Sequence, residues 1–390
     1  MPALAYLSAS TPLRMASAGA AAAIPILAVQ RLDDVAIGGF LVGASLAPSI
    51  VVAPLAGVAL DRARHPRALI AGAGLVTAAM FVVAAFLGPL PAGVVALALA
   101  VSGAATPFYF GGLSSFVTQA IADESRAYSA DALSYNIGSV AGPAVAAVAV
   151  GAGSAQAAMF ALAATALVGS VAMGGLRLAP HSDAGAERPR VWRQIGTGLA
   201  YLAGHRPIAV VTASGTLSQL GGGALPIAAL AISAQRSGTP VHAAWFITAF
   251  AVGALAGTLL ATAVPASRIP PEWRMGVGFA ATGLVLLAAT PDAGLAAALG
   301  LIGVAGVFTA HSTAPMLLLR TQQSPARLRS QVFTVGSALR TTAAAAGAAI
   351  AGLLASASVE LQLGAIAVVW VLSGVLMLAY PRRAAPVADS

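Results

Sequence analysis

The chain has 390 residues, of which 59% are hydrophobic and only 8% are charged, and its mean hydropathy is +0.89. Soluble domains carry about 25% charged residues, so the composition excludes an ordinary soluble enzyme, a disordered chain and a nucleic-acid-binding protein. The net charge of +8 comes from 20 basic residues, all of them arginine, and cysteine is absent. Disulfides, thiolate metal sites and thiol nucleophiles are therefore excluded.

Apolar stretches long enough to cross a membrane recur along the whole chain. A transmembrane helix needs about 20 mainly apolar residues, and twelve such stretches, bounded by turn residues or charges, can be marked. They cover residues 13–30, 37–60, 68–90, 93–118, 129–151, 155–176, 207–232, 241–264, 275–290, 294–319, 331–355 and 359–380. The sequence therefore predicts an all-α integral membrane protein with twelve transmembrane helices.

The loops between these stretches carry arginine very unequally. Only Arg31 and Arg236 fall on one side, whereas Arg14 and Arg340 lie inside stretches. Sixteen arginines fall on the other side: Arg62, Arg64, Arg67, Arg126, Arg177, Arg188, Arg190, Arg193, Arg206, Arg268, Arg274, Arg320, Arg327, Arg329, Arg382 and Arg383. Because cytoplasmic loops are enriched in positive residues, we expect both termini in the cytoplasm and the protein in the plasma (inner) membrane.

The longest polar stretch, 177–206, divides the chain into halves. Its start has the composition of a flexible linker. At its end, Val191, Ile195, Leu199 and Leu202 follow spacings of 4, 4 and 3, which fits an amphipathic helix on the membrane surface. The alternative is that these residues form the first turns of the seventh span. We predict an N-terminal bundle over 1–180, a cytoplasmic linker over 181–206 and a C-terminal bundle over 207–390.

The two halves repeat each other at an offset near 200 residues. Three pairs recur in the same span order: Ile24-Pro25-Ile26 with Leu225-Pro226-Ile227, Gly57 and Leu60 with Gly257 and Leu260, and Gly103 and Phe108 with Gly303 and Phe308. Two parallel six-helix repeats are typical of transporters that hold their substrate near the midplane. The repeat therefore predicts two pseudo-symmetric six-helix bundles.

The loop after the second span carries a recognisable motif. It reads Gly57-Val-Ala-Leu-Asp61-Arg62-Ala-Arg64-His65-Pro66-Arg67, which resembles the major facilitator superfamily signature G-x-x-x-D-R-x-G-R-R. Gly57, Asp61 and Arg62 match the signature, whereas the second glycine and the basic pair are replaced and Arg67 comes one place late. The resemblance implies alternating access, with Gly57, Asp61, Arg62 and Arg67 forming a latch between the halves. The alternative is a solvated turn with ordinary positive-inside charges.

The fifth span carries a second motif, Gly142-Pro143. It resembles the antiporter signature G-x(8)-G-P-x-x-G-G of the same superfamily, but Leu133 stands at the first glycine and Ala146 and Ala147 at the last two. The resemblance favours export. A helix kink at Gly142 and Pro143 in a tightly packed helix is the alternative.

One ionisable residue falls deep inside a predicted span. Arg340 lies about ten residues into the eleventh stretch, or roughly 15 Å at 1.5 Å per residue, and such residues usually mark function. We predict that it contacts an anionic group of the substrate. The alternative is a structural contact with carbonyl groups or with a carboxylate such as Asp131.

Further polar residues mark candidate substrate contacts. Helices one, four, seven and ten line the central cavity in the superfamily, so the resemblance selects Tyr109, Gln219 and His311; Asn136 in the fifth span is added. The run Gly221-Gly-Gly223 after Gln219 predicts a break in the seventh helix that frees backbone groups. For Tyr109, Gln219 and His311, helix packing with a satisfied polar tip is the alternative.

These features predict a secondary transporter that exports amphipathic or hydrophobic small molecules, an efflux antiporter in the lipid bilayer. Proton-coupled uptake of a small anionic metabolite and a non-transporting receptor or scaffold are the alternatives. No paired carboxylates, metal-spaced histidines or nucleophile motif lie together in the spans, so we expect no enzymatic activity, no metal and no cofactor. Spans one, four, seven and ten contain no Asp or Glu, so proton coupling is implied only by the resemblance. We expect a monomer and no nucleic-acid partner.

Overall fold

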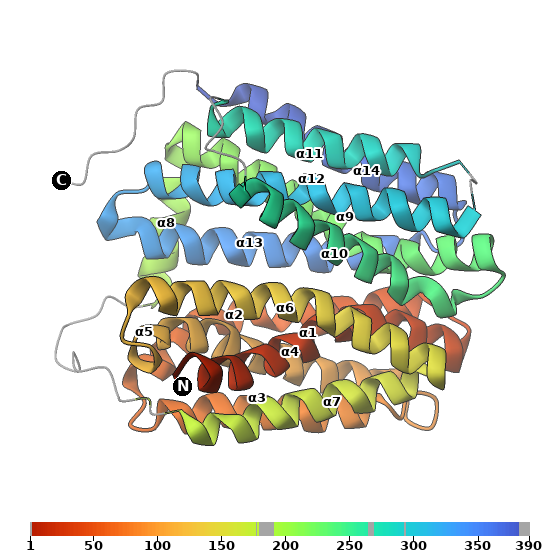
Figure 1. The fold of residues 1–390 in the computed structure, drawn as a ribbon, viewed down its shortest axis with the longest axis horizontal. Coiled ribbons are helices and arrows are strands. Elements are labelled where there is room, and N and C mark those ends of the chain that lie inside the picture. Colours follow the sequence, from red (N-terminus) through yellow and green to blue (C-terminus); the bar gives the residue numbers. More distant parts are fainter. Residues whose placement is uncertain (1, 177, 179–190, 264–268, 292–293, 382–390) are drawn as a thin grey trace. The chain divides into compact units, whose positions relative to one another are not determined.

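The structure, a computed structural model, describes residues 2–176, 178, 191–263, 269–291 and 294–381. Helices account for its regular elements over these ranges (Figure 1). Inside a bilayer no water is available to bind backbone N–H and C=O groups, so an apolar stretch must satisfy them along its own axis as a helix. Alanine and leucine, which dominate these stretches, are also strong helix formers.

Two compact packing units divide the chain. The first comprises Met1–Arg188 with Pro240–Thr248, and the second comprises Pro189–Thr239 with Ala249–Ser390. The helices that precede the linker are α1 (Pro2–Leu32), α2 (Val35–Arg62), α3 (Pro66–Ala84), α4 (Ala92–Ser115), the short α5 (Val117–Ala120), α6 (Glu124–Ala152) and α7 (Ala155–Ala172).

The helices that follow the linker repeat this series after one extra helix. They are α8 (Val191–Gly204), α9 (Arg206–Ser237), α10 (Ala243–Ala263), α11 (Pro271–Ala288), α12 (Gly294–Gln322), α13 (Ala326–Leu353) and α14 (Val359–Leu376). Single 3-10 turns follow α7, α9 and α14, at Met173–Gly175, Pro240–His242 and Met377–Ala379. α8 is a helix separate from α9, so the alternative that 191–204 forms the first turns of the seventh span is wrong.

Over the described residues, twelve long helices correspond to the twelve predicted stretches, and the predicted fold class is confirmed. Ten helices among the described residues are long and apolar enough to cross a membrane. The other two long helices, α11 and α13, have 18 and 28 residues. Each of these two helices carries arginine near its start, and α11 also carries Glu272 there. These charged residues lower the mean hydropathy of the helix without shortening the helix.

Local capping sets several helix ends. As the N-cap of α2, Asp34 accepts a hydrogen bond from the backbone N–H of Ile37 at 3.0 Å. Ser154 and Ser358 cap α7 and α14 in the same way. α9 ends at Gly238, whose φ of 72° lies in the left-handed region that glycine adopts without strain. These caps satisfy backbone groups that a helix end leaves without a partner.

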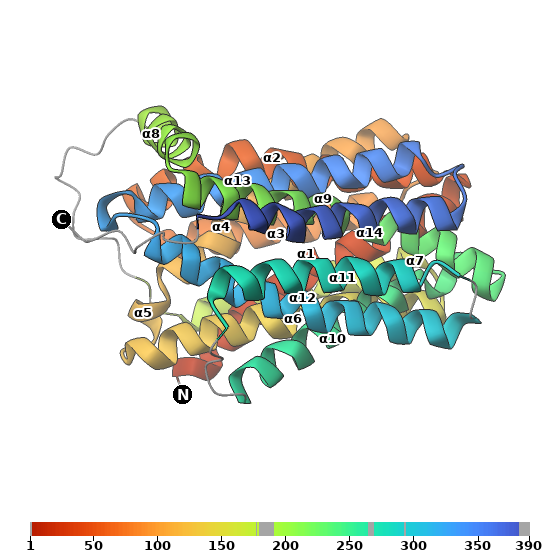
Figure 2. The same cartoon turned by 90° about the horizontal axis from the view of Figure 1, so that it is seen from above.

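Within each unit the helices pack in related ways. α1 packs against α6 and α7, and α4 packs against α2 and α3. In the second unit α9 packs against α13 and α14, and α11 lies beside α14 (Figure 2). Glycines permit close approach in both units: a Cβ at Gly103 would clash with the Ser45 carbonyl of α2, and one at Gly253 of α10 would clash with the Gly303 carbonyl of α12.

Candidate functional site

An ion pair joins α1 and α6 in the first unit. Arg14 Nη2 lies 2.7 Å from Asp131 Oδ1, and the two side chains are 1% and 14% exposed. Arg14 Nη1 also donates to the backbone carbonyl of Asp131 at 3.0 Å and to the hydroxyl of Ser134. Because an isolated charge is costly in apolar surroundings, each member of this pair depends on the other.

Neighbouring polar and aromatic groups complete the surroundings of this ion pair. Arg14 Nη2 donates to Ser114 Oγ at 3.0 Å, and the Tyr6 hydroxyl donates to the paired carboxylate at 2.5 Å. The Arg14 Cζ atom lies 3.5 Å from the centroid of the Tyr135 ring, an arrangement that stabilises a cation. Helices α1, α4 and α6 are thereby joined at one point.

The suggestion that Asp131 is the partner of Arg340 is wrong, because Asp131 binds Arg14. The sequence missed this pair for a physical reason. α1 begins at Pro2, eleven residues before the predicted span, so Arg14 lies well inside a helix rather than near its start. Tyr6 and Ser10, also buried in α1, interrupt the apolar stretch that would have marked the longer helix.

Arg320 and Arg340 lie in the second unit and have buried donors without a partner. Arg320, predicted to lie in a cytoplasmic loop, is in the last turn of α12 and is 1% exposed, so that prediction is wrong. Its Nε and Nη2 atoms are buried without a hydrogen-bond partner. Arg340, half-buried in α13, likewise has a buried Nε without a partner. The loop assignment failed because α12 continues to Gln322.

Tyr109 lies in the packed interior of the first unit. Its side chain is 0% exposed, and its hydroxyl lies 2.7 Å from Ser17 Oγ and 3.1 Å from Thr106 Oγ1. These contacts favour the helix-packing alternative, because they satisfy the polar tip of Tyr109 without a ligand.

The other three candidate substrate contacts, Asn136 in α6, Gln219 in α9 and His311 in α12, are half-buried. His311 Nδ1 lies 3.0 Å from the backbone carbonyl of Val307, one turn earlier in its helix. This hydrogen bond uses one ring nitrogen and leaves the other free to interact elsewhere. Because Asn136 belongs to the first unit and Gln219 and His311 to the second, the structure does not bring all three together within one unit.

The predicted latch residues lie at the end of α2 and the start of α3. Asp61 and Arg62 form the last turn of α2, where the structure describes their backbone. Gly57 is exposed, and a Cβ there would meet nothing within 4 Å. Arg67 Nη1 donates to the carbonyls of Gly174 at 3.4 Å and Leu176 at 3.2 Å. Arg67 therefore stabilises the end of α7 within its own unit.

The Gly142-Pro143 pair lies where α6 crosses α1. α6 runs without interruption through Pro143. A Cβ at Gly142 would clash with the carbonyl of Met15 and would lie 2.7 Å from the amide nitrogen of Gly19. Small residues at this crossing let the two backbones touch, and the crossing lies on the same two helices as the Arg14–Asp131 pair.

The glycine run 221–223 does not break α9, and that prediction is wrong. α9 is continuous from Arg206 to Ser237. Gly221 packs against the indole of Trp370, where a Cβ would lie 2.7 Å from Nε1, and Gly223 packs against the carbonyl of Ala344 in α13. Gly221 and Gly223 therefore permit close helix packing, and α9 stays continuous although Pro226 lies inside it.

An apolar groove lies between α8, α9 and α13. Its volume is about 600 Å³, within the usual range for sites that bind small molecules. It is lined by Leu199, Leu202, Ala203, Ala209, Thr212, Ala213, Thr216, Leu217, Leu220, Leu339, Ala343 and Leu376. The Oγ1 atoms of Thr212 and Thr216 are buried without a hydrogen-bond partner. The groove therefore has apolar walls, and no sequence motif marked it.

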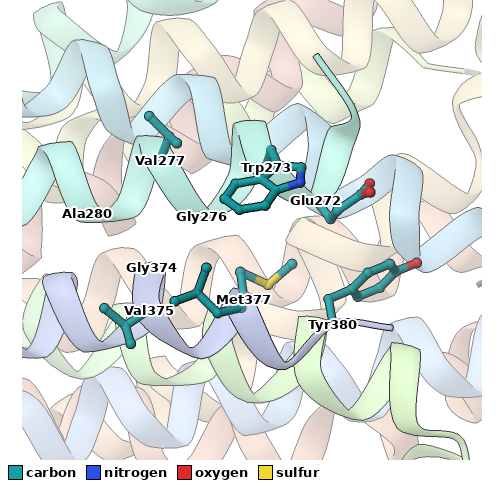
Figure 3. Close-up of a pocket in the computed structure, with 10 residues that line it drawn as sticks. Glu272, Trp273, Gly276, Val277, Ala280, Gly374, Val375, Met377 and Tyr380 are labelled. Carbon is teal, nitrogen blue, oxygen red and sulfur yellow. The ribbon is translucent and has the colours of Figure 1, made fainter. Parts of the chain in front are cut away.

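A second pocket separates the start of α11 from the end of α14 (Figure 3). Glu272 and Trp273 line it from α11, and Met377 and Tyr380 line it from the other side. Burial and the negative charge of Glu272 raise the pKa of Tyr380 to about 12, so the phenol stays neutral at physiological pH. Amphipathic aromatic side chains at helix ends are typical of the membrane interface.

Comparison with known proteins identifies the class. Long apolar helices in two packing units, with charged residues buried inside them, define a multi-pass membrane transporter. Residues 6–217 match the profile of the Major Facilitator Superfamily, and the chain belongs to this family. The chain is 26% identical, over 98% of its length and 95% of the relative's, to an uncharacterised MFS-type transporter, y4rN, of Sinorhizobium fredii (strain NBRC 101917 / NGR234).

Solved structures share the fold. The nucleoside transporter NupG matches with a TM-score of 0.80 and 13% identity, covering 97% of this chain and 100% of that one. The peptide transporter POT matches with a TM-score of 0.76 and 15% identity, covering 97% and 93%. A bacterial homologue of the human lysosomal transporter Spinster gives 0.73 and 12%, covering 97% and 96%. Members of this family are transporters rather than enzymes, and a non-transporting receptor is not favoured.

Proposed function

We propose that this transporter works by alternating access as a secondary active exporter of amphipathic or hydrophobic small molecules. The observation that carries the proposal is the groove of about 600 Å³ between α8, α9 and α13. Its leucine and alanine walls suit the apolar part of such a cargo. The Gly142-Pro143 pair in α6, with its resemblance to the antiporter signature, supports export over uptake.

The remaining features of the proposal follow the family resemblance. We propose protons as the coupling ion, a monomer as the working unit, and an inner-membrane location with both termini in the cytoplasm. Proton-coupled uptake of an anionic metabolite is the second candidate. Buried donors on Arg320 and Arg340 support it, because they favour a negatively charged ligand.

Filling the groove should lower export. Ala213→Phe places an aromatic ring among the groove-lining residues and should lower export of amphipathic compounds about tenfold, equivalent to about 1.4 kcal/mol of lost binding. The measurement is a compound-susceptibility and export panel in an efflux-deficient bacterial host. Ala234→Phe, at an exposed position of α9 outside the groove, is the matched control and should export normally. Equal export by both variants would contradict the role of the groove.

The latch makes a separate prediction. Asp61→Asn removes the negative charge that the latch would place against the N-terminus of the eleventh span. It should lower transport about two- to fivefold, the effect of about 0.3–1 kcal/mol for a carboxylate at the positive end of a helix dipole. Membrane insertion, measured by the amount of protein in the membrane fraction, should not change. Arg64→Gln, at an exposed position of the same loop, is the control. Normal transport by Asp61→Asn would contradict the proposal that Asp61 forms a latch between the halves.

A further inference from the structure

Arg320 is a fully buried cation whose donors are unsatisfied. Its side chain is 1% exposed, and its Nε and Nη2 atoms are buried without a partner. Arginine stays protonated in proteins and presents five N–H donors. A charge in the hydrocarbon region is expensive and marks a pathway or a ligand unless a protein group pairs with it.

Arg14 and Arg236, whose Nε atoms are also buried without a hydrogen-bond partner, differ from Arg320 in the hydrogen bonds of their other donors. Arg14 has the carboxylate of Asp131, a backbone carbonyl and two serine hydroxyls as partners. Arg236 donates to the carbonyls of Ala289, Thr290 and Pro291 at 2.6–3.2 Å. Among the residues that the structure describes, Arg320 has no such partners.

Two glycines make room for the Arg320 guanidinium. A Cβ at Gly336 of α13 would lie 3.2 Å from both Cζ and Nη2 of Arg320, and one at Gly215 of α9 would lie 3.8 Å from Nη2. The Met316 sulfur lies beside Gly215, where a Cβ would be 2.7 Å from it. The guanidinium therefore occupies a space shared by α9, α12 and α13, with apolar and backbone surroundings.

Arg340 adds a second positive charge close to the first. It follows Gly336 by four residues, which places both on one face of α13. Its charge acts on Arg320, and its Nε is also buried without a partner. Acidic side chains of the second unit that the structure describes are engaged elsewhere: Glu360 accepts from Gln235 at 3.1 Å, and Glu272 lies beside Tyr380. Two neighbouring cations that lack a carboxylate among the described residues of their unit favour an external anion.

We propose that Arg320 and Arg340 form an anion-binding site that takes the oxyanion of an amphipathic cargo, either a carboxylate or a phosphate monoester. The planar fork of a guanidinium binds two oxygens of such a group at once. This inference rests on the proposed function, because it gives the cargo a charge. It adds Arg320 to the binding residues and explains the glycines at 215 and 336.

Ligand binding to the purified full chain in detergent tests the proposal. Three probes that share one aromatic ring are compared: benzoate, phenyl phosphate and benzyl alcohol. Benzoate and phenyl phosphate should each raise the thermal unfolding midpoint of the wild type by more than benzyl alcohol does. Whichever of the two anions binds more tightly identifies the headgroup. Absence of a shift with both anions, or an equal shift with benzyl alcohol, would overturn the proposal.

Variants assign the binding to the two arginines. Arg320→Gln and Arg340→Gln should each weaken anion binding about ten- to hundredfold, the usual effect of losing a hydrogen bond to a charged group. Arg320→Lys keeps the positive charge but loses the planar guanidinium fork, so it should bind the anions with intermediate affinity. This variant also tests the site if Arg320→Gln does not fold. Arg206→Gln, at an exposed position of α9, should bind as the wild type does. Undiminished affinity in the Arg320 variants would also overturn the proposal.

Binding and export can fail separately. The binding measurement does not depend on transport, so a protein that binds anions but exports nothing would contradict only the proposed export. Conversely, a protein that exports uncharged amphipathic compounds but binds neither anion would contradict only the anion site.

Discussion

Replacing Asp131 by asparagine should destabilise the protein by about 3–5 kcal/mol, the usual cost of leaving one member of a buried ion pair without the other. The variant keeps the size of the side chain but removes the charge that Arg14 contacts at 2.7 Å. Arg14, at 1% exposure, would then remain charged in the interior with only neutral partners. The measurement is thermal or denaturant unfolding of the purified protein in detergent.

Two further variants show whether the ion pair is responsible. Asp33→Asn makes the same chemical change at an exposed position between α1 and α2 and should leave stability unchanged. The double variant Arg14→Leu with Asp131→Leu removes both charges and should recover most of the loss, because apolar pairs often replace buried ion pairs without cost. If the double variant were as unstable as Asp131→Asn, uncompensated charge could not be the cause.

A single methyl group at Gly142 should also destabilise the protein. Gly142→Ala places a Cβ against the Met15 carbonyl and 2.7 Å from the amide nitrogen of Gly19, so α1 and α6 must separate. Overpacking of this kind costs about 1–3 kcal/mol. Larger side chains at position 142 should cost more, because backbone atoms cannot turn away as a side chain can.

The matched control for Gly142→Ala lies on the same helix. A Cβ at Gly151 of α6 would meet nothing within 4 Å, so Gly151→Ala should be neutral or should stabilise the protein by up to about 1 kcal/mol through helix propensity. Both variants are compared with the wild type by unfolding in detergent. Equal stability of the two variants would mean that the α1–α6 crossing is not tightly packed.

The fold could be predicted from the sequence because the bilayer imposes it. Long apolar stretches have no alternative to helix in a membrane, so the twelve stretches correspond to twelve long helices. A helix cap could be predicted where a single side chain forms it. At Asp34, for example, the carboxylate accepts a hydrogen bond from the backbone N–H of Ile37. Helix ends that contain polar turns were harder to predict. α1, for example, begins at Pro2, well before the predicted span.

The candidate site was only partly predictable, because pairing depends on tertiary contacts. Arg14 and Asp131 are 117 residues apart in sequence, and no local pattern joins them. The burial of Arg320 depends on Gly215 and Gly336 in two other helices. Arg340 could be selected as a candidate site residue from the sequence, because a single charge inside a long apolar stretch is easy to recognise. Glycines were hardest to interpret, since the same residue either breaks a helix or lets two helices touch.

Flux into liposomes that contain only the purified protein tests the central claim most directly. An amphipathic fluorescent compound bearing a carboxylate is added outside, and its movement is followed with and without an imposed pH gradient. Saturable flux that depends on the protein, grows with the gradient and falls in Ala213→Phe is the expected result. Equal flux in protein-free liposomes and in liposomes containing the wild type would contradict the claim.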